Sequence, residues 1–340
     1  MPDRITPFML AWREDPDDPD RPEPGNPAVK HLAAEIAPGS TISDLGGAYS
    51  LNVLLEPAGL VLRVHQPFMT KQRLHAQQEV RRQLAGQGLI VPQPVAWGGS
   101  TLFRCGGRWA EVEEYVPHEM PVATMDSYFW LFQAMGGLHR ALDRVDVRVP
   151  RPYFAVYGPP ATLMRWLPIL EAAVKHDPEA AAIARHVREL VGKLRRQWIP
   201  ASQLPVRLIH GDVKLRNIAR TADGRTVCLD FGFMAKRSRI HEAGYAIARM
   251  LLTLGAGESP GDFAWGHVPR LLETYELAAG VKLTGLEHRA LGPAIASVAL
   301  YQATTCGFMP DPVADLRDDE RRRLMRVAGW VLDHPDTIPG

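Results

Sequence analysis

Short apolar runs separated by glycine and proline fill the first third of the chain, and this pattern predicts antiparallel strands joined by tight turns. The expected strands cover residues 41–45, 51–56, 60–65, 95–98 and 109–116. One helix is expected over residues 70–86. Its Leu74, Val80 and Leu84 recur at a helical spacing. This part of the chain therefore reads as a small sheet with a single helix.

From residue 123 onward the apolar positions follow a helical period instead. The expected helices cover residues 127–145, 161–174, 180–197, 239–254, 263–279, 286–305 and 317–332. Two strand-like runs, 206–209 and 226–229, interrupt them. A strand-rich part followed by a helical part predicts an α+β protein with two segregated lobes, joined near residues 115–117.

These patterns divide the chain into three parts. Residues 1–40 are an N-terminal extension, which we expect to be partly extended because residues 14–27 alternate prolines with acidic side chains. Residues 41–116 form the small N-lobe and residues 117–340 the larger C-lobe. A length of 340 residues is enough for two lobes with separate cores.

The overall composition narrows the classes of function. The chain has a formal net charge of +1 and is 46% hydrophobic, which is typical of a globular protein in water. This charge balance argues against a general electrostatic hold on nucleic acid. No uncharged apolar run reaches about 18 residues, so we expect no membrane partner. The three cysteines lack metal or disulfide spacing, which favours a reduced, cytoplasmic location.

The strongest chemical signal is a pair of short motifs in the C-lobe. An HGD triplet at 210–212 is followed by Asn217, and a DFG triplet at 230–232 begins thirteen residues after that asparagine. Each triplet follows an apolar, strand-like run. Its acidic residue is therefore expected at a strand end, where a polar group can emerge into a cleft.

Acidic and amide side chains in this pattern indicate phosphoryl transfer, whose metal ions need hard oxygen ligands and bridge the nucleotide phosphates. Asp230 can supply a carboxylate ligand for Mg²⁺ and Asn217 an amide oxygen. Asp212 would then face the acceptor hydroxyl as the catalytic base. Lys214 would place its ammonium group beside the phosphoryl group that is being transferred, where negative charge spreads in the transition state.

The order HGDxxxxN followed by DFG resembles the catalytic and metal-binding loops of protein-kinase-like enzymes. Gly211, after the histidine, resembles the aminoglycoside/choline phosphotransferase family, whose members phosphorylate small molecules. The resemblance implies a protein-kinase-like two-lobe fold with a small antiparallel-sheet N-lobe and a mainly helical C-lobe. It also implies ATP as phosphate donor, with GTP as an alternative, Mg²⁺ as cofactor, and a small molecule with a hydroxyl group as partner.

The same resemblance implies a nucleotide site in the N-lobe. Gly46, Gly47 and Ser50 match a hairpin over the phosphates, where the absence of a Cβ lets backbone N–H groups approach. Arg63, on the third strand between apolar neighbours, matches the cation that contacts the nucleotide, and it needs a partner. Glu79, in the middle of the helix, is the expected partner.

Two further positions follow from the family pattern. Glu114 and Val116 stand where the hinge is expected, and their backbone groups would hold the adenine edge. Glu242 stands where many relatives have an aspartate that ties the catalytic loop to the next helix.

Alternatives to a small-molecule kinase remain open at this stage. A catalytically idle nucleotide-binding scaffold would have lost the base or the metal ligands, yet Asp212, Asn217 and Asp230 are all present. A protein kinase would need a longer segment after DFG. The residues do not choose among an aminoglycoside or other antibiotic, a sugar or nucleoside, and an amino alcohol as acceptor. They leave the oligomeric state open, and also whether the role is in resistance, biosynthesis or metabolism.

Overall fold

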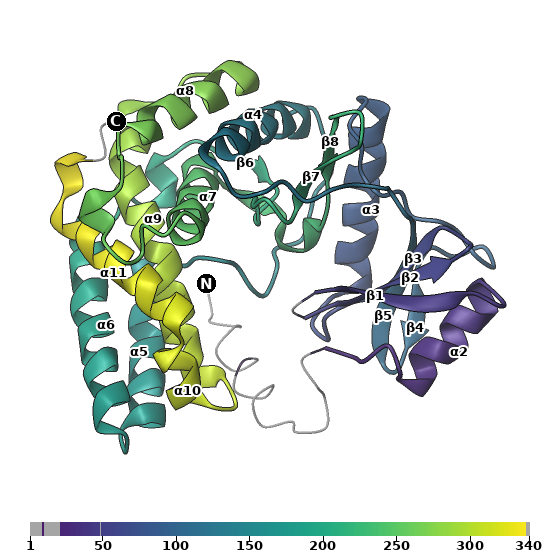
Figure 1. Cartoon of the computed structure of the whole chain (residues 1–340), viewed down its shortest axis with the longest axis horizontal. Helices are drawn as coiled ribbons and strands as arrows, with labels where there is room; N and C mark the ends of the chain where they lie inside the picture. Colours follow the sequence, from purple (N-terminus) through teal and green to yellow (C-terminus); the bar gives the residue numbers. More distant parts are fainter. Residues whose placement is uncertain (1–8, 10–20, 48, 338–340) are drawn as a thin grey trace.

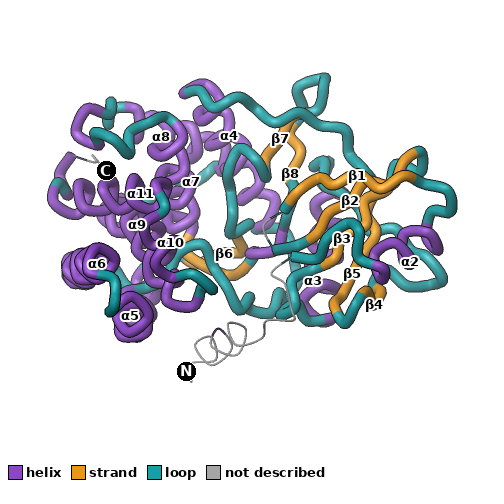
Figure 2. Tube along the Cα trace, turned by 60° about the horizontal axis from the view of Figure 1, so that its bottom comes forward, coloured by secondary structure: helices purple, strands orange, loops and turns teal. Residues whose placement is uncertain are grey.

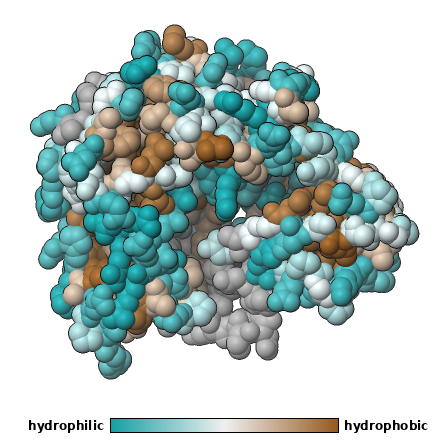
Figure 3. Space-filling view, viewed as in Figure 1, coloured by the Kyte–Doolittle hydropathy of each residue, from teal (hydrophilic) through white to brown (hydrophobic). Residues whose placement is uncertain are grey.

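The computed structural model of the chain describes residues 9, 21–47 and 49–337. A sheet-containing N-lobe and a helical C-lobe face each other (Figure 1), which confirms the predicted α+β arrangement. The space-filling view of the same face is hollowed between the lobes (Figure 3). The part of the predicted extended segment before residue 21 lies outside the described residues.

Five antiparallel strands form the N-lobe sheet in the order β1-β2-β3-β5-β4. They are β1 (Thr41–Gly46), β2 (Leu51–Glu56), β3 (Leu60–Val64), β4 (Phe103–Cys105) and β5 (Arg108–Glu114). On β2, Leu51, Val53 and Leu55 are fully buried, whereas the residues between them are half-buried. This period of two turns one face of the sheet toward a core.

The predicted strand at 95–98 is wrong. Pro94 and Trp97 make only isolated bridges, and Gly98 and Gly99 have φ values of +54° and +77°. Proline has no N–H for a continuous ladder, and the two glycines turn the chain. The edge strand therefore forms later, at β4.

The N-terminal extension was expected to be only partly extended, and within it α2 (Pro27–Ile36) is a helix that the sequence analysis did not predict. The Asn26 side chain caps it by accepting a hydrogen bond from Ala28 N at 2.9 Å. The proline at its first position is tolerated there, since that N–H would have no partner within the helix. Val29 and Leu32 are buried in the cluster formed with the sheet.

The second N-lobe helix, α3 (Lys71–Gly86), joins the two lobes. Thr70 caps it by accepting a hydrogen bond from Arg73 N at 3.2 Å. Leu74 packs with N-lobe residues, whereas Val80 and Leu84 belong to the core cluster of the C-lobe. Because α3 contacts both cores, it fixes the sheet relative to the catalytic loop.

The C-lobe consists mainly of helices, and Figure 2 shows them gathered on the side away from the sheet. They are α4 (Met125–Leu142), α5 (Pro160–Val174), α6 (Pro178–Gln197), α7 (Arg239–Thr253), α8 (His267–Ala279), α9 (Gly285–Thr305), α10 (Pro312–Arg317) and α11 (Asp319–Asp333). Two short antiparallel ladders accompany them: β6 (Val206–Ile209) with β9 (Ala235–Ser238), and β7 (Ile218–Arg220) with β8 (Thr226–Cys228). Sequence patterns missed β7, β9 and α10, which are too short to show a clear period.

Helix α9 runs through the centre of the C-lobe and packs against α5, α6, α7 and α11. It begins with a capping box, in which Thr284 and Glu287 satisfy each other's backbone N–H groups. Fourteen of its 21 residues are buried, and its apolar positions surround the helix rather than lie on one stripe. Among the described residues, no helix is long and apolar enough to cross a membrane.

Candidate active site

The catalytic loop begins where β6 ends, at His210. His210 is fully buried, and its Nε2 lies 2.7 Å from the carbonyl oxygen of Leu229, just before the DFG triplet. Gly211 has φ of +88°, and a Cβ there would lie 2.3 Å from the carbonyl oxygen of Phe233. Glycine is therefore required at this position because the segment after DFG passes directly against the loop.

Asp212 is held by three donors. Its Oδ2 accepts hydrogen bonds from Asn217 Nδ2 at 2.7 Å and from Lys214 Nζ at 2.8 Å. Its Oδ1 accepts one from the hydroxyl of Tyr245 at 2.5 Å. The carboxylate is only 2% exposed. These bonds fix its rotamer, so the group that would meet an acceptor hydroxyl is preorganised.

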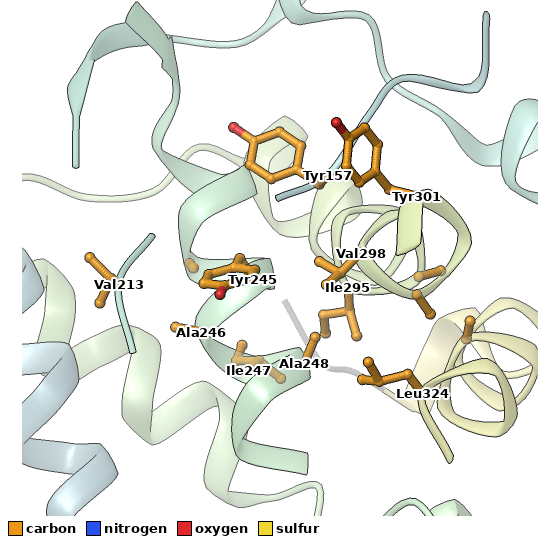
Figure 4. Close-up of a cluster of buried hydrophobic side chains, with 14 of the residues drawn as sticks. Tyr157, Val213, Tyr245, Ala246, Ile247, Ala248, Ile295, Val298, Tyr301 and Leu324 are labelled. Carbon is orange, nitrogen blue, oxygen red and sulfur yellow. The ribbon is translucent and has the colours of Figure 1, made fainter. Parts of the chain in front are cut away.

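Tyr245, on α7, is a site residue that the sequence analysis missed. It lies fifteen positions after Asp230, and no local sequence pattern connects it to the two motifs. Burial and the neighbouring charge of Asp212 raise the pKa of Tyr245 well above its usual value, so its hydroxyl keeps its proton and donates. In Figure 4 its ring lies between Val213 of the catalytic loop and Ile295 of α9.

A second layer of polar contacts supports the loop from behind. Glu242 Oε1 accepts a hydrogen bond from Gly211 N at 2.5 Å, and Glu242 Oε2 lies 2.6 Å from His139 Nε2. His139 Nδ1 in turn lies 3.0 Å from the hydroxyl of Tyr275. Burial opposes ionisation of Glu242, but the hydrogen bonds from His139 and Gly211 outweigh it and lower its pKa. The glutamate therefore ties the loop to α7 as expected.

Asp230 has left-handed backbone angles, φ 53° and ψ 72°, in a residue that is not glycine. Its carboxylate forms an ion pair with Arg63 of β3 across the lobes. Burial opposes ionisation of Asp230, but the charges of Arg63 and Lys214 outweigh it and lower its pKa to about 2. A carboxylate with these neighbours is negatively charged at any physiological pH, as a metal ligand must be.

The predicted pairing of Arg63 with Glu79 is wrong. Glu79 is about one third exposed and instead contacts Arg82 and Gln83 on its own helix. The face of α3 that meets the sheet and the DFG segment carries cations and amides instead of an acid. The sequence offered Glu79 as the only acidic residue of the helix, but helical rotation turns it away from β3.

The acids of this region lie on strand β5. Arg81 of α3 pairs with Glu111 Oε2 at 2.5 Å and also with Glu113. Register pairs Arg63 with Glu111, so two arginines face two glutamates, and Arg63 and Glu113 of this group line the interlobe cavity. Burial disfavours a charge on Arg63, but the carboxylates of Asp230, Glu113 and Glu111 outweigh it and raise its pKa.

Helix α3 also holds the DFG segment through residues that the sequence analysis missed. Arg73 Nη2 donates hydrogen bonds to the carbonyl oxygens of Gly232 at 2.7 Å and Met234 at 2.8 Å. Gln77 Nε2 donates to the carbonyl oxygen of Phe231 at 3.1 Å. Arg73, Gln77 and Arg81 recur every four residues. This polar stripe on one face of the helix is the sequence signal that could have identified them.

The glycine hairpin lies between β1 and β2. Gly46 and Gly47 have φ of +85° and +127°, and a Cβ on Gly47 would lie 2.3 Å from the carbonyl oxygen of Ser50. The Asn52 side chain donates to the carbonyl oxygen of Gly46 at 2.9 Å and closes the turn. The hairpin thus has the backbone that a close approach to phosphate requires.

A cavity of about 880 Å³ between the lobes brings the predicted residues together. Those that line it are Gly46, Gly47, Ser50, Arg63, Glu114, Val116, Asp212, Lys214, Asn217 and Asp230, whereas Glu79 does not. The volume is in the range of small-molecule and cofactor sites.

The two predicted metal ligands fit Mg²⁺. Asn217 uses its Nδ2 for Asp212, with bonds to both the backbone and side-chain oxygens of that residue, which leaves Oδ1 for a cation. Asp230 supplies an ionised carboxylate in the same cavity. No cluster of three or more His, Cys, Asp or Glu residues occurs in the described part of the chain. Mg²⁺ typically takes only one or two protein oxygens and completes its shell with water and phosphate.

Sequence comparison identifies the family. The model of the phosphotransferase enzyme family, APH, matches residues 41–275. This span contains the glycine hairpin, the catalytic loop and the DFG triplet, and it covers more than half of the chain. The chain therefore belongs to this family, and the expected enzyme class of phosphotransferase is confirmed. No curated protein matches the chain significantly in sequence.

Solved structures of other small-molecule kinases share the fold. A microcompartment-associated aminopropanol kinase has a TM-score of 0.66 and 16% identity, with 91% of this chain and 96% of that chain covered. An aminoglycoside phosphotransferase from Alicyclobacillus acidocaldarius has a TM-score of 0.57 and 13% identity, with 92% and 100% covered. The GDP complex of aminoglycoside 2'-phosphotransferase-IIIa has a TM-score of 0.53 and 13% identity, with 90% and 96% covered. These likenesses confirm the protein-kinase-like fold.

Proposed function

We propose that this phosphotransferase is a small-molecule kinase that transfers the γ-phosphoryl group of ATP to a hydroxyl group. The observation that carries the proposal is the meeting of Asp212, Asn217 and Asp230 in one interlobe cavity that also contains the glycine hairpin. These three groups come from two separate loops. Their convergence beside a phosphate-binding type of turn matches the needs of phosphoryl transfer.

Each residue has a distinct role in the proposed reaction. Asp212 orients the acceptor hydroxyl and takes its proton, while the hydroxyl oxygen bonds to the γ-phosphorus. The bond from that phosphorus to the oxygen bridging the β- and γ-phosphates breaks, and ADP leaves. Lys214, whose Nζ lies 2.8 Å from Asp212 Oδ2, would offset the charge of the transferred group. Asn217 and Asp230 would hold Mg²⁺, which neutralises charge on the phosphates.

The nucleotide is expected to extend from these loops toward β5. Glu114 and Val116 line the cavity at the end of that strand, and their backbone groups would meet the base. Gly46, Gly47 and Ser50 would cover the phosphates. ATP is the proposed donor. The GDP complex of one similar structure makes GTP the alternative to test beside it.

The short connection after DFG argues against a protein kinase. Only residues 233–238 separate Gly232 from α7, and β9 occupies most of them. A peptide-docking segment has no room there. A catalytically idle scaffold is disfavoured because the proposed base and both proposed metal ligands are present in one cavity.

The test is a pair of variants measured with Mg-ATP. Asp212→Asn should lower phosphoryl transfer by about a hundredfold or more, the scale of a positioned base, and leave nucleotide affinity unchanged. Asp230→Ala should abolish the dependence of ATP affinity on Mg²⁺, measured by calorimetry. Asp333→Asn, at an exposed pair with Lys193, is the control. Equal turnover by Asp212→Asn would refute the proposed base, and unchanged Mg-ATP affinity in Asp230→Ala would refute the metal site.

A further inference from the structure

Part of the cavity lining comes from the C-lobe helices α9 and α11 and from segments beside them. Its members are residues 154–156 before α5, Tyr301, Gln302 and Thr305 of α9, Met309, and Arg321 of α11. We call this set the C-lobe wall. It shares one cavity with Asp212, and α7, whose Tyr245 donates to that carboxylate, packs against α9 of the wall. An acceptor molecule with its hydroxyl at Asp212 would therefore rest on this wall.

The C-lobe wall has no carboxylate. Four carboxylate residues occur among the described residues that line the cavity: Glu113, Glu114, Asp212 and Asp230. Three of them have the basic partners described above, and Glu114 ends β5 beside the predicted hinge. An amine on the acceptor would thus meet no unpaired negative charge at the wall.

The charged member of the wall is a cation. Arg321 Nη1 donates to the carbonyl oxygen of Asp315 at 2.7 Å and lies 3.9 Å from Asp318 Oδ1, and Nη2 lies 2.9 Å from Asp315 Oδ1. Neither aspartate lines the cavity, so the acceptor would meet the guanidinium side of this group. A positively charged acceptor group would meet a cation with only N–H donors there, whereas a carboxylate or an amide oxygen would be accepted.

The rest of the wall is largely aromatic and apolar. Phe154 packs on Phe68 of the N-lobe with ring centroids 4.6 Å apart, and both residues line the cavity. Burial raises the pKa of Tyr301 to about 12, so its hydroxyl carries no charge. Gln302, half-buried on α9, adds a neutral amide.

We infer that the acceptor is a hydroxyl compound with an apolar, ring-sized body and no positive charge, whose polar end is neutral or acidic and faces Gln302 and Arg321. This inference rests on the proposed function, because it places the acceptor hydroxyl at Asp212. It separates this chain from the aminopropanol and aminoglycoside enzymes of similar fold, whose named substrates carry amines.

Three probes of equal size and different charge test this inference. They are 4-(hydroxymethyl)benzamide, 4-(hydroxymethyl)benzoate and 4-(aminomethyl)benzyl alcohol, offered to the full chain with Mg-ADP for binding and with Mg-ATP for transfer. The amide and the benzoate should bind at least about tenfold more tightly than the amine, because like charges meet at Arg321. Equal or tighter binding of the amine, or binding of none of the three, would overturn the inference.

A single substitution should reverse the preference. Gln302→Glu adds one carboxylate to the wall at nearly constant volume, and it should raise affinity for the amine about tenfold while weakening the benzoate. Gln203→Glu, at an exposed position away from the cavity, is the matched control. An unchanged order in Gln302→Glu would count against the wall as the acceptor site. If that variant fails to fold, the ranking of the three probes on the native chain decides.

The two proposals fail in different ways. Loss of Mg-ATP binding to the native chain would refute the proposed function whatever the probes do. Phosphorylation of the amine in preference to the other two probes would leave the kinase function intact and refute only the acceptor class.

Discussion

The catalytic loop and strand β3 each present a charged group to the same cavity, but they hold it in different ways. In the loop, Asp212 receives hydrogen bonds from Lys214 and Asn217, which lie two and five positions further along the chain. Such contacts are set by the local path of the backbone. The loop therefore has the geometry that its motif suggests, with Tyr245 as an addition from α7.

On β3, the partners of the cation come from elsewhere. Arg63 pairs with Asp230, 167 positions away, and the acids beside it lie on β5 and not on α3. Helix α3 contributes Arg81, a cation, where an acid was expected. The comparison teaches that a short motif determines the contacts between its own residues. The partners of a long-range ion pair, in contrast, can come from a different element than the one expected.

The largest expected effect is on stability and concerns Arg81 of α3 and its two glutamate partners on β5. Arg81→Ala should destabilise the protein by about 3–5 kcal/mol, because it leaves the buried Glu111 and Glu113 without their cation. Arg82→Ala, one position along at an exposed pair, should cost less than about 1 kcal/mol. Urea unfolding measures both. Equal losses would show that the buried network contributes nothing beyond a surface pair.

The next effect concerns the support behind the catalytic loop. Glu242→Gln should lower the free energy of unfolding at pH 7 by about 1.5–3 kcal/mol, the range for hydrogen bonds to a charged group. The native pKa of Glu242 lies below its usual 4.5, so the stability from its ionisation is present above that value and is lost as pH falls through the native pKa. The gap between native chain and variant should therefore narrow below about pH 4.5. A gap that is constant from pH 7 to pH 3.5 would contradict this assignment.

A smaller effect is expected from the contact that the loop receives from α7. Tyr245→Phe should lower kcat about tenfold, equivalent to about 1.4 kcal/mol, because Asp212 loses the donor that fixes its Oδ1. The KM for ATP should stay the same, since the nucleotide takes no part in the hydrogen bond between Tyr245 and Asp212. Tyr128→Phe, another buried tyrosine that does not line the cavity, is the control. A rise in KM without a fall in kcat would show that Tyr245 does not position the base.

The smallest effect is expected for Glu79, which was predicted to pair with Arg63 and does not. Glu79→Ala should change the free energy of unfolding by about 0.5 kcal/mol or less and leave Mg-ATP affinity unaltered, because its side chain contacts only its own helix. Calorimetry and urea unfolding measure the two quantities. A large loss of nucleotide affinity would restore Glu79 as a functional partner of Arg63.

Elements with a long, clear period were predicted well from the sequence. Helix α6 (Pro178–Gln197), expected over residues 180–197, agrees with the structure because many apolar positions repeat along it. Of the short elements, the apolar runs at β6 and β8 were recognised, whereas β7 and β9 were missed because they form by pairing with those strands. Helix α2 was missed because the prolines and acidic residues before it do not suggest a helix. Packing on the sheet stabilises it.

By itself, the sequence determined the two-lobe class, the glycine turn and the two motifs proposed for catalysis and metal binding, because these depend on local periodicity and on residues a few positions apart. Tertiary structure decided that Asp230 pairs with Arg63, that Tyr245 reaches Asp212, and that Glu79 faces away. Each of these outcomes depends on the rotation of a helix or the register of a strand across the lobes. Such geometry is fixed by packing of the whole chain, since no short stretch of residues contains both partners.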